Sequence, residues 1–258
     1  MPARRCAADY GAQQFDRPAR LSAASDDAGF TPASVPADQL TIEYHGAALY
    51  PGAALSILDD LEATFTGLPT DQAGLRLHGV SGLAAVLDVA GPLGRIAAER
   101  QGENSRPVRA ILFDKSAATN WALGWHQDRT IAVGTRVDVA GFGPWSVKAG
   151  IVHVEPPFAL LETMLTMRIH LDSVPETNAP LLIAPGSHRL GRVAERDIDT
   201  GVARCGTFAC LADRGDVWLY ATPILHASSR AVRPEHRRVL QVDFSAQALP
   251  PGLDWLGI

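Results

Sequence analysis

Apolar residues recur at two different spacings along this chain, and the spacing changes near residue 106. Over residues 51–67 and 81–100 they return every three or four positions, as at Leu55, Leu58 and Leu61, which predicts amphipathic helices. After residue 106, glycine and proline turns divide the chain into short apolar runs. Together with one earlier run, these predict strands over residues 41–50, 108–113, 129–137, 161–171, 181–184, 216–220 and 238–244.

The order of these elements predicts a mainly β fold with flanking helices. Helices come first and many short strands follow, which disfavours an alternating βαβ sheet. We expect a double-stranded β-helix, a jelly-roll and cupin-like barrel, with the helices packed outside one sheet. Residues 1–38 are rich in Ala, Pro, Ser and Asp, so we expect a poorly ordered or surface-draped segment there. Residues 39–258 are expected to form a single domain.

Composition narrows the classes of partner. The net charge is −5 and the sequence pI is about 5.9, so the chain lacks the basic character typical of nucleic-acid-binding proteins. We see no apolar run long enough to span a bilayer, and no apolar signal core follows Arg4 and Arg5. The chain has three cysteines, which argues against a disulfide framework. We therefore expect a cytoplasmic protein with a small-molecule partner, not a nucleic acid or a membrane.

The strongest chemical signal is the run Trp125-His126-Gln127-Asp128, taken together with His226 far downstream. Side chains alternate along a strand, so His126 and Asp128 would share one face and Gln127 the other. A second imidazole from His226 would complete a 2-His-1-carboxylate metal site, the set typical of non-haem Fe(II) oxygenases.

A second tripeptide with the same pattern is His170-Leu171-Asp172. It also lies on or beside a predicted strand and can pair with His226 in the same way. Asp172 is followed by a polar, turn-rich stretch, where its carboxylate can accept backbone N–H bonds instead. The residues alone favour the first motif only modestly, and both remain open.

A resemblance separates the two motifs. The segments ILFDKSAATNWALGWHQDRTIAV (111–133), NAPLLIAPGSHRLG (178–191), GDVWLYATPILHASS (215–229) and HRRVLQVDF (236–244) resemble the phytanoyl-CoA dioxygenase family of Fe(II)/2-oxoglutarate-dependent oxygenases. The similarity covers about residues 106–244. It departs from the family at Ala179, where many relatives have glycine. In the family, an H-x-D element before the P-G-S-H turn supplies two metal ligands, and the W-H-Q-D run matches it, so the resemblance selects His126 and Asp128.

The resemblance also implies the remaining site residues. It assigns Fe(II) to His126, Asp128 and His226, and it assigns 2-oxoglutarate to Arg237 and Ser228. Further candidate contacts with substrate or co-substrate are Lys115, Asn120, Trp121 and His153.

The co-substrate arginine has a neighbour, Arg238, that is a second candidate. Alternation places Arg238 on the apolar face of its strand, with Leu240 and Val242. Arg237 falls on the other face, with Gln241. A carboxylate-binding arginine should line a partly polar cavity, which favours Arg237, as does the spacing in the resembling family.

The expected activity is hydroxylation of a C–H bond in a small organic substrate by dioxygen, with release of succinate and CO2. Related halogenases have glycine or alanine in place of the carboxylate that Asp128 supplies, so we expect oxygenation and not halogenation. Two alternatives are a cupin-like metal-dependent isomerase or hydrolase, which needs no co-substrate arginine, and a non-catalytic jelly-roll that only binds a ligand.

Overall fold

The computed structural model of the chain describes residues 35–69 and 72–258. The poorly ordered segment expected over residues 1–38 lies outside these residues up to position 34. A short 3-10 helix, η1 (Ala37–Gln39), crosses the predicted boundary. The division of the chain at residue 38 therefore stays a prediction.

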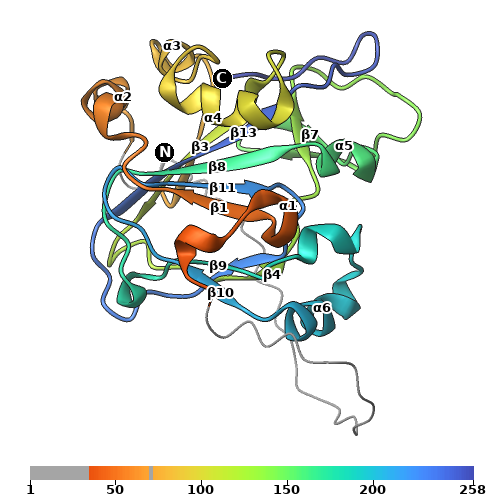
Figure 1. Ribbon diagram of the computed structural model, residues 1–258. Coiled ribbons are helices and arrows are strands. Elements are labelled where there is room, and N and C mark those ends of the chain that lie inside the picture. Colours follow the sequence, from red (N-terminus) through yellow and green to blue (C-terminus); the bar gives the residue numbers. More distant parts are fainter. Residues whose placement is uncertain (1–34, 70–71) are drawn as a thin grey trace, which may run out of the picture. The chain divides into compact units, whose positions relative to one another are not determined.

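A six-stranded antiparallel sheet is the largest element of the fold (Figure 1). Its strands are β1 (Ala47–Tyr50), β2 (Gly74–Leu77), β3 (Arg106–Lys115), β8 (Leu165–His170), β11 (Val217–Ala221) and β13 (Arg237–Ser245), and they lie side by side in the order β1-β11-β8-β13-β3-β2. Side chains alternate between the two faces. On β13, Leu240 and Val242 join the main apolar core, whereas Arg237 and Gln241 point to the other face.

A four-stranded sheet lies across from that polar face. It consists of β4 (Leu123–His126), β9 (Leu181–Ile183), β10 (Phe208–Cys210) and β12 (His226–Ser228), in the order β10-β9-β12-β4. A smaller sheet of β5 (Ile131–Val133), β6 (Trp145–Lys148) and β7 (Ile151–Val154) is inserted between β4 and β8. The two larger antiparallel sheets confirm the predicted mainly β, double-stranded β-helix fold.

Helices cover the apolar face of the six-stranded sheet (Figure 1). They are α2 (Leu58–Thr64), α3 (Leu83–Val86) and α4 (Pro92–Gln101), as the sequence predicted. Leu61 and Leu93 from these helices pack in one buried cluster with Met167, Leu219 and Leu240 of the sheet. The main apolar core thus lies outside the barrel. A second apolar cluster, which includes Leu181, Ile183, Trp218 and Tyr220, joins the two larger sheets, and polar side chains occupy the rest of the space between them.

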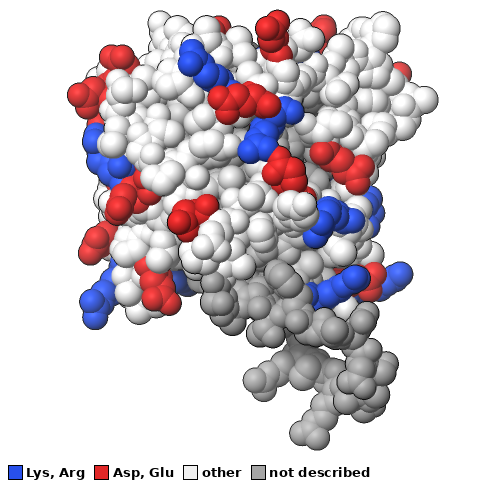
Figure 2. Space-filling model, in the orientation of Figure 1, with Lys and Arg blue, Asp and Glu red and all other residues white. Residues whose placement is uncertain are grey.

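The other helices are short. They are α1 (Ile42–His45), α5 (Phe158–Glu162), α6 (Ile198–Cys205) and the 3-10 helices η2 (Leu55–Ile57), η3 (Glu176–Asn178), η4 (Ser187–Leu190) and η5 (Glu195–Asp197). None of the helices in the described residues is long and apolar enough to cross a bilayer. On the face shown in Figure 2, basic and acidic side chains are interspersed.

Three strand predictions were wrong in part. Residues 42–45 form α1, because the Thr41 hydroxyl accepts a hydrogen bond from the Tyr44 amide (3.4 Å) and caps a helix. Of the strand predicted over residues 129–137, only β5 forms. The strand predicted over residues 161–171 is shortened to β8, because residues 158–162 form the helix α5. Strands β2, β6, β7 and β10 were not predicted. Each has only three or four residues, too few for a clear alternation.

Candidate metal centre

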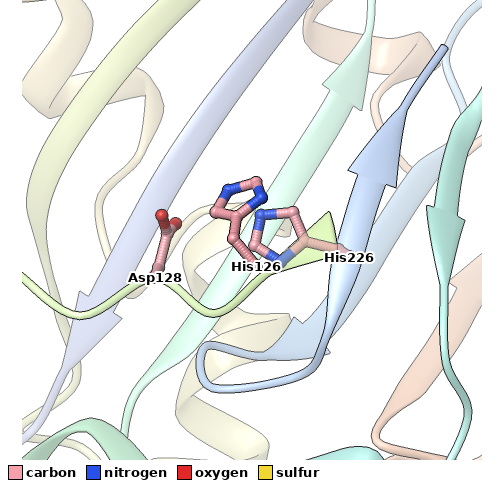
Figure 3. Close-up of side chains that lie close together, drawn as sticks. All are labelled: His126, Asp128 and His226. Atoms are coloured by element: carbon pink, nitrogen blue, oxygen red, sulfur yellow. The ribbon is translucent and has the colours of Figure 1, made fainter. Parts of the chain in front are cut away.

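Three side chains that can hold a metal ion meet between the two larger sheets (Figure 3). His126 is the last residue of β4, Asp128 lies in the loop that follows, and His226 is the first residue of β12. His126 and His226 are partners across the antiparallel strand pair, with ring centroids 4.2 Å apart. The ligand atoms of all three residues lie within 4.8 Å of one another.

Each imidazole contacts a backbone carbonyl through Nδ1, which turns Nε2 away from the backbone. His126 Nδ1 lies 2.8 Å from the Gly124 carbonyl oxygen, and His226 Nδ1 lies 2.9 Å from the Ile224 carbonyl oxygen. A carbonyl accepts, so each Nδ1 carries a proton, and Nε2 is the nitrogen of each ring that can ligate a metal. Burial and the neighbouring His126 lower the pKa of His226 to about 4. The ring is therefore neutral at neutral pH, the form that ligates a metal.

Asp128 is not on a strand, contrary to the sequence prediction, because β4 ends at His126. The alternation nevertheless continues past the strand end. The Gln127 amide points away from the site and donates to the carbonyls of Gly191 (2.9 Å) and Pro223 (2.8 Å). Its oxygen accepts from the Val193 amide (2.9 Å). These three bonds fix the loop and leave Asp128 on the side of His126.

Arg109, on β3, holds the Asp128 carboxylate. Its Nη2 donates to Asp128 Oδ2 (3.2 Å), and its Nε donates to Asp243 Oδ2 (2.6 Å). Burial raises the pKa of Asp128, but the charges of Arg109, His226 and His126 hold it well below its usual range. The carboxylate is therefore ionised. The sequence analysis did not identify Arg109. It lies six residues from Lys115 on the same strand, so alternation places both side chains on the interior face.

Replacing Arg109 with leucine should lower the free energy of unfolding by about 3 kcal/mol, because removing one member of a buried ion pair leaves a buried charge without compensation. Here two carboxylates would face each other. Urea denaturation of the metal-free protein measures the change. Arg136→Leu is the matched control, since the side chains of the Arg136–Asp138 pair are 62% and 84% exposed and such a pair contributes about 0.5 kcal/mol. Equal losses in both variants would contradict this role of Arg109.

The second tripeptide motif does not form a metal site. His170 faces the barrel interior, and neither ring nitrogen has a hydrogen-bond partner in the described structure. Asp172 follows the strand and accepts from Arg238 Nε (2.9 Å) and Nη2 (2.8 Å). Within the described residues, the group of His126, Asp128 and His226 is the one set of His, Cys, Asp and Glu side chains with metal-binding geometry.

The two adjacent arginines have different surroundings. Arg238 is paired with Asp172 and, through Nη2, with Glu62 (2.8 Å) on the helical side of the sheet. Arg237 is 2% exposed and faces the interior, where it forms no ion pair with any described carboxylate. Its Nη1 donates to the carbonyl of Ala179, a non-glycine residue with φ of 51°. Burial and the charge of Arg168 lower the pKa of Arg237 to about 9. A buried cation without a counter-charge suits an anionic ligand.

Two other expected contacts lie beside Arg237. Lys115 is fully buried and is the register partner of Arg237 on the neighbouring strand. Its ammonium donates to the carbonyls of Trp121 (2.7 Å) and Ser229 (2.8 Å) and lies 3.4 Å from Ser228 Oγ. Burial and the charge of Arg237 lower the pKa of Lys115 to about 7. Lys115, Ser228 and Arg237 therefore form one cationic, hydrogen-bonding end of the interior.

The remaining expected contacts have different surroundings from one another. The Trp121 ring lies under the Lys115 ammonium, 4.7 Å from ring centroid to Nζ. The Asn120 amide is occupied by the backbone of Ala231, through bonds of 3.0 and 2.8 Å. His153 is completely buried, with Nδ1 2.9 Å from the Ile151 carbonyl oxygen and Nε2 without a partner in the described structure.

Comparisons with known proteins agree with this architecture. Residues 81–239 match the family model described as phytanoyl-CoA dioxygenase (PhyH). HygX from Streptomyces hygroscopicus, solved with nickel and 2-oxoglutarate bound, is similar at 14% identity and a TM-score of 0.54, covering 79% of this chain and 84% of HygX. EctD from S. alaskensis is similar at 16% identity and a TM-score of 0.54, covering 84% of this chain and 78% of EctD.

EvdMO1 is a third similar structure, at 20% identity and a TM-score of 0.52, covering 80% of this chain. This chain spans only 48% of the EvdMO1 chain. No curated protein matches the sequence. At these identities the structural likenesses establish the fold alone.

Proposed function

This chain belongs to the phytanoyl-CoA dioxygenase family, and on that premise we propose that it is an Fe(II)- and 2-oxoglutarate-dependent dioxygenase. The proposed reaction converts a substrate C–H bond, dioxygen and 2-oxoglutarate to a C–OH group, succinate and CO2. The observation that carries the proposal is the meeting of two imidazoles and one carboxylate, whose ligand atoms lie within 4.8 Å of one another. This donor set suits Fe(II) and leaves coordination positions open for other ligands.

In this proposal, each residue of the metal centre has a specific role. His126, Asp128 and His226 would hold the ferrous ion, which supplies dioxygen activation coupled to decarboxylation of 2-oxoglutarate when it is bound. The hydrogen bonds from Nδ1 keep both imidazoles in the orientation that presents Nε2. Arg109 keeps the Asp128 carboxylate ionised and directed into the site.

Arg237 is the proposed anchor for the remote carboxylate of 2-oxoglutarate, with Ser228 and Lys115 beside it. Its planar guanidinium can bind a carboxylate through two parallel hydrogen bonds, and it has no described counter-charge to displace. HygX structures contain nickel with 2-oxoglutarate in one case and iron in another, which supports the same ligands here.

Hydroxylation is favoured over halogenation because Asp128 occupies the carboxylate position that halogenases lack. The cupin-like isomerase or hydrolase is disfavoured, since it needs no co-substrate arginine. The non-catalytic jelly-roll is disfavoured because it requires a ligand set too dispersed to chelate, whereas these three ligand atoms lie within 4.8 Å of one another. The substrate is then a small organic molecule, with dioxygen as the second partner. The free thiols of Cys205 and Cys210 are compatible with a cytoplasmic location, which is part of the proposal.

Anaerobic titration tests the proposed function. Adding Fe(II) and then 2-oxoglutarate should produce a visible charge-transfer band that neither addition produces alone. On admission of air, the protein should release succinate in step with the loss of 2-oxoglutarate. Absence of both the band and succinate, with folded protein and fresh Fe(II), would overturn the assignment.

A further inference from the structure

A second group of cations lies on the Asp128 side of the metal centre, away from Arg237. Along the inner face of β3, Arg109 contacts Asp128, whereas Lys115 lies beside Arg237. These two positions are six residues apart, which is roughly 20 Å along a strand. The interior therefore has two distinct cationic ends, and only the Lys115 end has a role in the proposed co-substrate site.

Arg76 and Lys148 belong to the Asp128 end. Arg76, on β2, is the register partner of Ile111, which is two residues from Arg109 on the same face of β3. Lys148, at the end of β6, places its Nζ 3.4 Å from the hydroxyl of Thr130, two residues after Asp128. Lys148 is exposed to solvent, and its pKa is lowered by partial desolvation and by the charges of Arg109 and Arg76, whereas the charge of Asp128 raises it. All of these groups thus border one region.

Neither Arg76 nor Lys148 forms an ion pair with a carboxylate of residues 35–69 or 72–258. Arg76 Nε is buried and has no described hydrogen-bond partner. Arg109 differs, because Asp128 and Asp243 compensate its charge. Buried polar groups are nearly always hydrogen-bonded, so the unpartnered Nε of Arg76, with the exposed ammonium of Lys148 bordering the same region, points to an absent anion.

His153 adds a neutral hydrogen-bonding group to the same region. Val152 and Val154 pack into an apolar cluster, so alternation turns His153 to the other side of β7. Its Nδ1 donates to the Ile151 carbonyl, which leaves Nε2 as a buried acceptor without a described partner. Burial, and then the charges of Arg109, Lys148 and Arg76, lower the pKa of His153 to about 4, so Nε2 remains an acceptor at neutral pH.

We propose that the substrate carries a carboxylate or phosphate group, which Arg76 and Lys148 bind beside the metal centre. A hydroxyl or amine on the same molecule donates to His153 Nε2. Each oxygen of the anionic group accepts charge-assisted hydrogen bonds from the guanidinium or the ammonium. This inference rests on the proposed oxygenase function and specifies the class of its substrate.

Matched six-carbon probes test the charge preference. Hexanoate, hexyl phosphate and hexanamide are titrated anaerobically into protein saturated with Fe(II) and 2-oxoglutarate, and the change in the charge-transfer band gives each dissociation constant. At least one anion should bind about tenfold more tightly than the neutral amide. Tighter hexanoate indicates a carboxylate substrate, and tighter hexyl phosphate indicates a phosphate ester. Equal affinities for both anions and the amide would overturn the inference.

Variants identify the residues responsible. Arg76→Gln and Lys148→Gln should each bring the ratio of amide to anion dissociation constants close to one. The ratio is insensitive to partial loading of a variant. Arg136→Gln removes an exposed cation with its own partner, Asp138, and should keep the wild-type ratio. An unchanged ratio in both the Arg76 and Lys148 variants would contradict the assignment.

The same data separate this inference from the function on which it rests. Failure of wild-type protein to give the band with Fe(II) and 2-oxoglutarate overturns the oxygenase proposal. A normal band, with no preference for either anion, overturns only the substrate class.

Discussion

Replacing His126, Asp128 or His226 with alanine is expected to weaken Fe(II) binding by at least about a hundredfold. Even the loss of a residue that only orients a metal ligand costs roughly 10–100-fold in affinity, and these three side chains are the proposed ligands themselves. Anaerobic competition of Fe(II) against a metal-sensitive dye measures the dissociation constant. Because binding is measured without 2-oxoglutarate, the result does not depend on catalysis.

The second motif supplies the matched controls. His170→Ala and Asp172→Ala should retain wild-type Fe(II) affinity, since neither residue belongs to the group with metal-binding geometry and Asp172 is bound to Arg238. Loss of Fe(II) binding in this second pair, together with its retention in the first, would show that the metal motif had been assigned to the wrong tripeptide.

Replacing Arg237 with glutamine is expected to weaken 2-oxoglutarate binding by about a hundredfold, which follows from the 2–5 kcal/mol typical of truncating one partner of a buried charge pair. The same change should leave the free energy of unfolding of the ligand-free protein unchanged or slightly higher. It removes a buried cation, 2% exposed, that has no described counter-charge. Titration of the charge-transfer band and urea denaturation measure the two quantities.

Arg238→Gln distinguishes a role in ligand binding from a general effect on this strand. This arginine is paired with Asp172 and Glu62, so its loss should lower stability and change 2-oxoglutarate affinity less than about twofold. If Arg238→Gln weakened 2-oxoglutarate binding more than Arg237→Gln, the proposed anchor would be wrong.

The alternation of side chains made much of this site predictable from the sequence. It separated Arg237 from Arg238, and the structure places them on opposite faces of β13. It also placed Gln127 away from His126 and Asp128, although no strand extends past His126. The loop keeps this arrangement because the Gln127 amide is fixed by three backbone groups, which a strand prediction does not include.

Other parts of the site depend on contacts between distant segments. Arg76 lies on a four-residue strand with too little periodicity to identify, and the pairing of β2 with β3 places it on the face of the sheet that carries Arg109. The sequence marks Asn120 as a contact because it precedes the metal motif, but the backbone of Ala231 occupies its amide. The alternation of side chains along β3 could have placed Arg109 in the interior, but it could not identify Asp128 and Asp243 as its partners.

The central claim is that three side chains from β4, the loop after it and β12 hold one metal ion. A crystal structure of the protein grown anaerobically with Mn(II) and 2-oxoglutarate tests it most directly, because anomalous scattering locates the metal independently of the protein atoms. We expect one strong anomalous peak, within bonding distance of Nε2 of His126, Nε2 of His226 and a carboxylate oxygen of Asp128. A fully loaded crystal with its metal at any other group of side chains would contradict it.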